Sequence, residues 1–105
     1  MDESEFEARA TAALEAIERE LENLDLDFEL KGAGVLEIEF DDDSKIIVNR
    51  HGAAREIWVA ARSGGFHFRW DGTAWRDTRN GSELFAALSE LVSLQLGRAV
   101  RLPPT

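Results

Sequence analysis

The chain of 105 residues contains no cysteine. This excludes a disulfide framework, a thiolate zinc site, a cysteine-held iron-sulfur cluster and a thiol nucleophile. Long hydrophobic runs are missing too, because none approaches the roughly 18 residues that a membrane-spanning helix needs. The first ten residues, MDESEFEARA, are acidic where a secretory signal peptide is basic. We therefore expect a cytoplasmic protein that is not exported.

Basic residues are scarce, since 12 Lys and Arg stand against 21 Asp and Glu and give a net charge of -9. The imbalance is uneven along the chain. Residues 1–43 carry 16 acidic and three basic residues, whereas residues 44–105 carry nine basic and five acidic ones. Nucleic acids and anionic membranes are bound mainly through Lys and Arg, so we expect neither as a partner. The acidic excess instead predicts one strongly negative surface built by the first two-fifths of the chain.

Sequence motifs for nucleotide binding and for catalysis are also lacking. The chain has neither the G-x-G-x-x-G nor the G-x-x-x-x-G-K-[ST] phosphate-binding pattern, and no H-E-x-x-H metal motif. The two histidines, His51 and His67, have no Ser or Cys partner in a recognisable nucleophile motif. We interpret them as ordinary surface residues, with a metal or catalytic role as the alternative.

A helix is predicted at each end of the chain. The first runs from Ser4 to about Leu24 and begins with a capping box formed by Ser4 and Glu7. The second has Ser82 as its N-cap and Gly97 as its C-cap. Each has apolar residues three and four positions apart, which gives one apolar stripe. The stripes consist of Phe6, Ala10, Ala13, Leu14, Ile17, Leu21 and Leu24, and of Leu84, Phe85, Leu88, Leu91, Val92 and Leu96.

Between the helices the hydrophobic period changes to two, which is typical of strands. The candidate strands are residues 35–40, 45–50, 56–62, 66–70 and 73–77. Their connections are short and polar, which favours an antiparallel meander. We predict an α+β two-layer sandwich in which both helices pack on one face of an antiparallel sheet of five to six strands. Residues 1–105 are expected to form one domain, with residues 103–105 as a disordered tail.

Carboxylates gather on one flank of the first predicted helix. On a helical wheel the flank contains Glu7, Glu15, Glu18, Glu22 and Asp25. Like charges three or four residues apart cost about 0.2–0.5 kcal/mol per pair, and anions at a helix C-terminus oppose the macrodipole. Local stability therefore does not explain the pattern. The hairpin that follows adds Glu37, Glu39 and Asp41 to Asp43, and the two sets form one ridge if its first strand lies beside the helix.

Three interpretations of this acidic ridge are open. Clustered carboxylates supply the hard oxygen ligands that suit Fe, Mn, Ca or Mg, with weak and poorly selective binding. A docking surface for a basic protein is the second interpretation, because complementary charge speeds and orients association. The third is a solvated acidic face that keeps the protein soluble.

A tryptophan is predicted on the opposite side of the sheet. In the run Glu56-Ile57-Trp58-Val59-Ala60, Ile57 and Val59 share one face and Trp58 lies on the other. If Ile57 and Val59 face the helices, Trp58 is on the open face and Asn49 of the neighbouring run lies near it. Large exposed aromatics often anchor interfaces. The alternative places Trp58 in the core, and Trp70 and Trp75 are expected to pack structurally at the end of the sheet.

Several segments together resemble the bacterial frataxin (CyaY) family across essentially the whole chain. They are Ser4-Glu5-Phe6, Gly34-Val35-Leu36, Ser44-Lys45-Ile46-Ile47-Val48-Asn49-Arg50, Ile57-Trp58-Val59-Ala60, Gly64-Gly65-Phe66-His67-Phe68, Trp75 and the helix between Gly81 and Gly97. The resemblance implies a monomeric frataxin-like sandwich whose first helix and first strand present an acidic ridge.

The resemblance also implies a function. Members of the family bind ferrous and ferric iron weakly through the ridge, dock the ridge on a cysteine desulfurase, and regulate or supply iron for iron-sulfur cluster assembly. Carried over by position, and extended by Glu15 from the helical wheel, the expected metal ligands are Glu15, Glu18, Glu22, Asp25, Asp27 and Glu29. The expected partner-binding residues are Glu18, Glu22, Glu37, Glu39, Asn49 and Trp58.

The sequence departs from the family pattern at three positions. Arg19 and Asn23 stand where relatives often have acidic residues, and Glu15, Glu20, Glu37 and Glu39 are expected to compensate. Glu56 stands where a glutamine commonly precedes the Ile/Val-Trp pair.

We therefore predict a non-enzymatic iron-binding protein that docks on the cysteine desulfurase and the iron-sulfur scaffold protein. It is expected to be a monomer, with iron-dependent oligomers and binding of other hard divalent cations left open. One alternative is a ferroxidase, although neither histidine has the Glu three residues before it that di-iron sites commonly use. The other is an acidic interaction module with no metal role.

Overall fold

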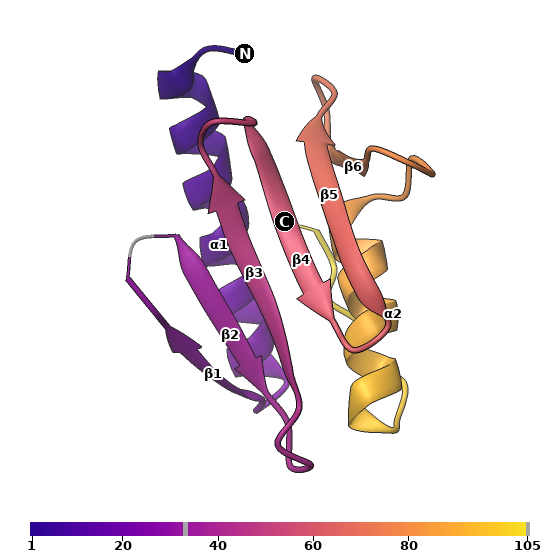
Figure 1. The fold of residues 1–105 in the computed structure, drawn as a ribbon. Helices are drawn as coiled ribbons and strands as arrows, with labels where there is room; N and C mark the ends of the chain where they lie inside the picture. Colours follow the sequence, from indigo (N-terminus) through magenta and orange to yellow (C-terminus); the bar gives the residue numbers. More distant parts are fainter. Residues whose placement is uncertain (33, 105) are drawn as a thin grey trace.

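Six antiparallel strands form one sheet, and both helices cover the same face of it (Figure 1). The computed structural model describes residues 1–32 and 34–104. The elements are α1 (Glu3–Asn23), β1 (Asp27–Leu30), β2 (Val35–Glu39), β3 (Lys45–His51), β4 (Glu56–Ala61), β5 (Gly64–Trp70), β6 (Trp75–Asp77) and α2 (Leu84–Leu96). The strands lie in chain order, so the predicted α+β sandwich and its meander are confirmed. No helix in the described ranges is both long and apolar enough to cross a membrane.

The first helix begins earlier than predicted. Asp2 is its N-cap, and the Asp2 side chain accepts a 2.8 Å hydrogen bond from the backbone N–H of Glu5. Ser4 therefore lies inside the first turn, and the predicted capping box of Ser4 and Glu7 is wrong. The helix ends at Asn23 with Leu24 as its C-cap, which agrees with the predicted end to within one residue.

The second helix is capped by a carboxylate. Glu83, not the predicted Ser82, is the N-cap, and its side chain accepts hydrogen bonds from the backbone N–H groups of Phe85 and Ala86 at 2.8 and 3.0 Å. An anion at this end also complements the helix dipole. The predicted C-cap is confirmed, since Gly97 adopts the left-handed conformation that ends many helices.

The edge strand β1 was not predicted. Its sequence, Asp-Phe-Glu-Leu, has only four residues, and three of them are exposed. Acidic residues are disfavoured in strands, so the local pattern does not indicate a strand. Pairing with β2 decides the conformation, because Phe28 lies opposite Ile38 and Leu30 opposite Leu36. β1, and not the strand that starts at Val35, is therefore the edge strand beside α1.

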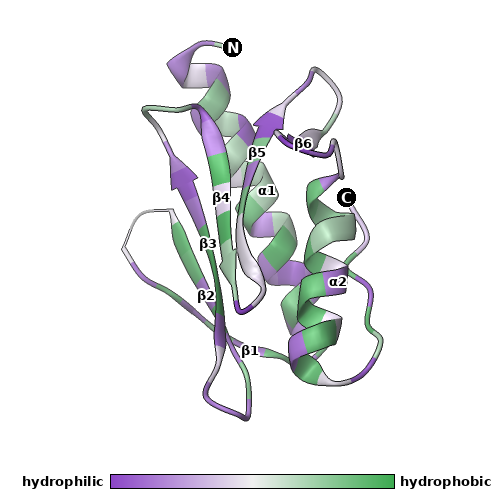
Figure 2. Ribbon diagram, turned by 45° about the vertical axis from the view of Figure 1, so that its right-hand side comes forward, coloured by the Kyte–Doolittle hydropathy of each residue, from purple (hydrophilic) through white to green (hydrophobic). Residues whose placement is uncertain are grey.

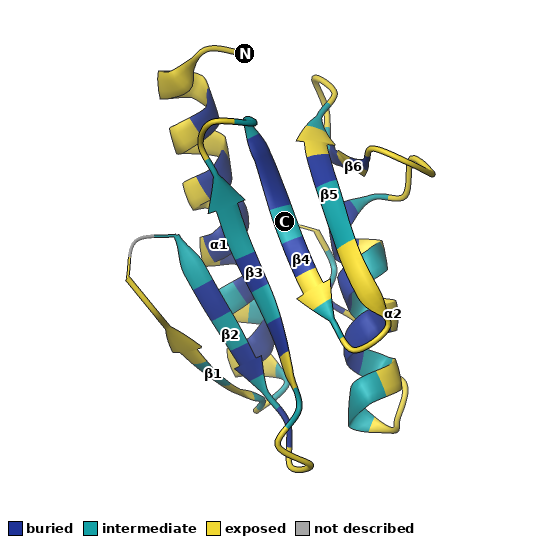
Figure 3. Cartoon of the chain, in the orientation of Figure 1, coloured by how far each residue is buried: buried dark blue, intermediate teal, exposed yellow. Residues whose placement is uncertain are grey.

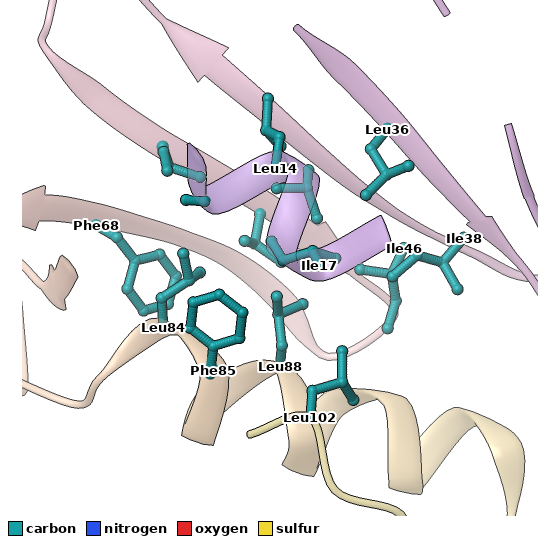
Figure 4. Close-up of a cluster of buried hydrophobic side chains, with 14 of the residues drawn as sticks. Leu14, Ile17, Leu36, Ile38, Ile46, Phe68, Leu84, Phe85, Leu88 and Leu102 are labelled. Carbon is teal, nitrogen blue, oxygen red and sulfur yellow. The ribbon is translucent and has the colours of Figure 1, made fainter. Parts of the chain in front are cut away.

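Apolar side chains fill the space between the sheet and the helices. α2 is hydrophobic over much of its surface, and α1 presents its buried residues to the sheet (Figures 2 and 3). Figure 4 shows side chains of both helices meeting those of the strands. The largest fully buried side chains are Phe6, Phe68, Ile17, Leu21, Leu36, Ile38, Ile46, Ile57, Leu84, Leu88, Leu102 and Val48.

The segment after α2 returns to the core. Leu102 is fully buried, and its backbone N–H donates a 2.8 Å hydrogen bond to the hydroxyl of Ser89. Pro103 is half-buried and Pro104 exposed, whereas Thr105 lies outside the described residues. The predicted disordered tail at 103–105 and the single-domain assignment stay predictions.

Candidate functional site: acidic edge and open sheet face

Four carboxylates lie together on the open face of the sheet, at the edge formed by β1 and β2. The register places Asp27 opposite Glu39 and Glu29 opposite Glu37. All four alternate with residues that face the core, such as Phe28 and Ile38, so they point away from the helices. Like charges directly opposite each other destabilise a strand pair. This arrangement therefore works against the stability of the sheet edge.

A second acidic set lies on α1. Glu15 and Glu22 are exposed and Glu18 is half-buried, each one helical turn from the next. Burial raises the pKa of Glu18 above its ordinary value, and the negative charges of Glu15 and Glu22 raise it further. Burial and the like charges of its two neighbours therefore both disfavour the ionised form of Glu18 in the folded protein.

The two sets adjoin across β1. A groove of about 180 Å³ runs between α1 and the connection from β1 to β2, and Glu15 and Glu18 line it together with Leu30 and Gly32. The helix set thus borders the edge strand on the helix side, and the sheet set borders it on the open side. We call the two sets, Glu15, Glu18, Glu22, Asp27, Glu29, Glu37 and Glu39, the acidic edge.

Two lysines partly neutralise the acidic edge. Lys45 pairs with Glu37 at 3.1 Å and Lys31 pairs with Glu29 at 3.3 Å. The hydrogen bond and charge of Glu37, followed by the charges of Glu39 and Glu29, raise the pKa of Lys45. Lys45 therefore interacts electrostatically with three of the four sheet carboxylates, Glu29, Glu37 and Glu39.

The carboxylates do not form a ready-made metal cage. Within residues 1–32 and 34–104, no group of three or more His, Asp or Glu side chains converges closely enough to hold a metal ion. The donor set itself consists of carboxylate oxygens, which suit hard cations. This geometry fits cations that keep part of their water shell, held by one or two carboxylates at a time.

Two sequence-predicted acidic residues lie apart from the flank expected for them. Asp25 follows the end of α1 and has a φ of 61°, so it is not a helical residue and the wheel does not apply to it. Glu7 pairs with Arg50 of β3. The structure therefore keeps Glu15, Glu18 and Glu22 together on the helix, and places Asp25 in the connection to β1.

The centre of the open face is formed by three stacked aromatic side chains, His51, Trp58 and His67. Ile57 and Val59 are buried in the core, so Trp58 lies on the open face as predicted, with Asn49 as its register partner. Trp58 is half-buried, however, because its indole stacks between two imidazoles. The ring centroids of His51 and His67 lie 3.8 and 4.3 Å from that of Trp58, with interplanar angles of 13° and 8°.

A buried carboxylate lies beside this stack. Glu56 accepts a 2.8 Å hydrogen bond from Nε1 of Trp58 and a 2.5 Å bond from Nη2 of Arg69. Burial alone raises the pKa of Glu56, but the hydrogen bonds from Trp58 and Arg69 and the charge of Arg69 outweigh it, so the pKa is lowered. Glu56 is therefore held ionised.

Sequence reasoning missed the ring stack and the role of the edge strand. His51 and His67 were interpreted as ordinary surface histidines, because neither their facing strands nor their register was known. The expectation that Trp70 and Trp75 pack structurally at the end of the sheet is confirmed. The two are register partners in β5 and β6, and their ring centroids lie 5.7 Å apart.

Comparison with known proteins points to one family. A family model described as a frataxin-like domain matches residues 1–98. The iron-sulfur cluster assembly protein CyaY of Dechloromonas aromatica is 64% identical over 102 residues, with 95% of this chain and 97% of that protein covered. The protein of the same name from Paraburkholderia phymatum is 50% identical, with 99% and 100% covered.

Solved structures give the same result. The frataxin of Psychromonas ingrahamii superposes with a TM-score of 0.89 at 29% identity, covering 99% of this chain and 100% of that chain. A trimeric frataxin from the yeast Saccharomyces cerevisiae, complexed with ferrous, gives a TM-score of 0.73 at 27% identity, covering 85% and 86%.

Proposed function

The chain belongs to the frataxin-like family, and from this premise we propose that it is an iron-binding protein that regulates or supplies iron for iron-sulfur cluster assembly. The observation that carries the proposal is the acidic edge. Its carboxylates repel one another both along α1 and across β1 and β2, so folding stability gives no reason for them. A surface kept at a cost to stability is expected to bind something of opposite charge.

The first ligand of this surface is iron, taken up as cargo. Glu15, Glu18, Glu22, Asp27 and Glu29, with Asp25 in the adjoining connection, replace some of the waters around Fe2+ or Fe3+. Carboxylates suit hard cations in general, so other divalent ions bind as well. Binding is weak because no three ligands in the described part of the chain are arranged around one point.

The second ligand is a protein. The cysteine desulfurase, with its iron-sulfur scaffold protein, offers Lys and Arg to Glu18 and Glu22 and to the sheet carboxylates Glu37 and Glu39. Asn49 and Trp58 share the open face with Glu37 and Glu39, so they extend the contact across the sheet. The protein acts as a cytoplasmic monomer, and iron-dependent oligomers are the alternative.

The metal role is tested by an anaerobic NMR titration with Fe(II). We expect saturable shifts and broadening of amides in α1 and β1, and at least a fivefold loss of affinity in Glu18→Gln/Glu22→Gln, since two of the few carboxylates near the ion are gone. The control Glu3→Gln/Glu90→Gln removes the same charge from exposed positions away from the acidic edge. Equal affinity in both double variants would contradict an iron site on α1.

The docking role is tested by the affinity for the purified desulfurase. Glu18→Gln/Glu22→Gln should bind more weakly than Glu3→Gln/Glu90→Gln, and the affinity of the unaltered protein should fall with added salt. Exposed charges are screened over about 8–10 Å at 0.1–0.15 M ionic strength. Salt-independent affinity would contradict docking through the acidic edge.

The protein is proposed to act without turnover. The relatives named above are described as iron-sulfur cluster assembly proteins, which supports a non-enzymatic role. The alternative, a ferroxidase, requires catalytic oxygen consumption with Fe(II). Oxygen electrode measurements that show many turnovers per protein molecule would replace our proposal with this alternative.

A further inference from the structure

Glu56 is a buried carboxylate on the face of the sheet that the helices leave open. Only 5% of the residue is exposed, although it lies in the outward-facing row of β4. A buried carboxylate is costly unless each oxygen has a strong partner. Here Oε1 accepts from the indole of Trp58 and Oε2 from the guanidinium of Arg69. Burying this charge is costly, and the side chain that the carboxylate binds, Trp58, suggests the reason.

The group that it holds is the central ring of a stack. His51, Trp58 and His67 come from three adjacent strands, β3, β4 and β5. The ring spacings of 3.8 and 4.3 Å are close to the roughly 4.8 Å between neighbouring strands. The rings therefore follow one another across the strands and present their edges outward.

One end of the stack is held by a hydrogen bond, and the other end lies beside Glu56. Nδ1 of His51 accepts a 3.2 Å hydrogen bond from the backbone N–H of Ala54 in the turn before β4. Nδ1 of His67 lies 3.7 Å from Oε1 of Glu56, and the register places His67 directly opposite Trp58. The bond from Trp58 to Glu56 then sets the rotation of the middle ring.

We propose that Glu56 is a positioning residue, which fixes the indole of Trp58 between His51 and His67 so that the three rings form one preorganised contact plate. The proposal rests on the proposed function, because it assumes that this face docks on the desulfurase and scaffold proteins. A preorganised surface loses less conformational freedom on binding, so it binds more tightly for the same contacts.

A carboxylate fits this task better than an amide does. Trp58 and Arg69 donate to different oxygens of Glu56. Glutamine has an acceptor oxygen at only one of these two positions and an NH2 donor at the other, so it could keep only one of the two bonds in this geometry. We expect glutamine to keep the bond to the half-buried indole, because the exposed guanidinium of Arg69 can bind water instead. Valine, with its strong strand preference, removes both bonds. This difference supplies a graded set of variants.

The first experiment observes the plate directly by NMR. In Glu56→Val we expect the Trp58 indole N–H resonance to move upfield and the ring-current shifts of the His51 and His67 ring protons to collapse. In Glu56→Gln, and in the control Arg69→Gln, the indole bond and the ring-current shifts should persist. Unchanged ring-current shifts in Glu56→Val would overturn the proposal.

Hydrogen exchange keeps the proposal testable if Glu56→Val does not fold. In the unaltered protein, the Trp58 indole N–H should exchange with D2O at least tenfold more slowly than that of half-buried Trp70, because its acceptor is a buried carboxylate. Faster or equal exchange at Trp58 would overturn the proposal.

The second experiment measures affinity for the purified desulfurase–scaffold complex. Glu56→Val should weaken docking about tenfold, Glu56→Gln by less than threefold, and Glu56→Val should add nothing when Trp58→Phe is already present. If the Glu56→Val effect persists in the Trp58→Phe background, Glu56 does not act through Trp58 and the proposal is wrong.

The two hypotheses fail in different ways. Suppose that Glu56→Val shows the expected NMR changes, and that docking weakens in Glu18→Gln/Glu22→Gln but not in Glu56→Val. The contact plate then lies outside the interface with the desulfurase–scaffold complex, and the positioning role of Glu56 in docking is overturned. If neither variant weakens docking, the proposed docking function fails as well.

Discussion

The guanidinium of Arg50 in β3 pairs with the carboxylate of Glu7 in α1. It also donates a 2.8 Å hydrogen bond to the hydroxyl of Thr11. The side chain reaches the helix by passing over Gly34, where a Cβ would lie only 2.6–2.8 Å from three atoms of Arg50. The contact therefore ties α1 to the sheet beside the acidic edge, and it requires a glycine at position 34.

We predict that Gly34→Ala destabilises the protein more than Gly32→Ala does. Both glycines have a positive φ, 84° at Gly34 and 62° at Gly32, but a Cβ at Gly32 would meet nothing within 4 Å. Gly32→Ala should cost about 1 kcal/mol from backbone strain alone, and Gly34→Ala about 2–4 kcal/mol because the contact with Arg50 is added. Urea unfolding of both variants measures the difference.

Arg50→Ala separates the two causes of this loss. Removing the Arg50 side chain opens the space over Gly34, so the two glycine variants should have nearly equal costs in that background. An excess for Gly34→Ala that persists without Arg50 would show that the contact is not its source.

The main elements of the fold could be predicted because their patterns are local. The apolar stripe of α1 and the alternating run Leu36, Ile38 and Phe40 each indicate their own secondary structure. β1 could not be predicted, because its conformation depends on pairing with β2. The two N-caps were wrong by one or two residues for different local reasons. Asp2 and Ser4 are both favoured N-cap types, whereas Glu83 is not among the favoured types and Ser82 is, so the sequence pointed to Ser82.

Lys45→Gln is predicted to increase the affinity for divalent cations. Lys45 forms an ion pair with Glu37 and is attracted by the charges of Glu39 and Glu29. Removing its charge therefore leaves these three carboxylates more available to bind a cation. We expect a two- to fivefold tighter Fe(II) or Mn(II) binding, within the modest range of exposed charge interactions. Arg9→Gln is the control, since it removes the same charge from a pair with Glu5 elsewhere on α1. Equal effects of the two variants would indicate a response to net charge only.

Glu18→Gln is predicted to stabilise the protein at neutral pH. The pKa of Glu18 is raised by burial and by Glu15 and Glu22, so the ionised form is disfavoured in the folded state. Removing the charge should add roughly 0.5–1 kcal/mol, corresponding to two like-charge pairs.

The gain should disappear as the pH falls through the raised pKa towards the ordinary value of 4.5, because Glu18 then becomes neutral by itself. Thermal unfolding with a chelator present measures this. Glu3→Gln is the control and should have the opposite sign, since Glu3 lies in the first turn of α1, where the helix dipole favours an anion.

Leu102→Ala is predicted to destabilise the protein by about 2–4 kcal/mol, the usual cost of emptying a buried leucine site. Leu102 is 1% exposed, although it lies in the segment after α2 and outside every helix and strand. Leu94→Ala is the matched control, since Leu94 is 73% exposed and should cost less than about 0.5 kcal/mol. Equal losses in chemical unfolding would mean that the segment after α2 is not part of the core.

The candidate site could be predicted in its charge but not in its geometry. The excess of acidic residues in the first 43 positions is visible in the sequence, and so is the helical spacing of Glu15, Glu18 and Glu22. The opposition of Glu29 and Glu37, and the stacking of His51 on Trp58, depend on strand register. Register is set by the buried face of each strand, so outward-facing partners follow only when the structure is known.

Glu56→Gln is predicted to lower stability at neutral pH by about 1 kcal/mol, because glutamine keeps the bond to Trp58 but loses the charge-assisted bond to Arg69. The pKa of Glu56 is lowered in the folded state, so its contribution to stability is complete above its ordinary value of 4.5. As the pH falls from 4.5 through the lowered pKa, the contribution disappears. The unaltered protein and Glu56→Gln should therefore converge in unfolding free energy at acid pH, whereas Glu18→Gln converges from the opposite side. A Glu56→Gln difference that stays constant from pH 7 to pH 2.5 would mean that the charge of Glu56 contributes nothing, and that the carboxylate is not held by Arg69.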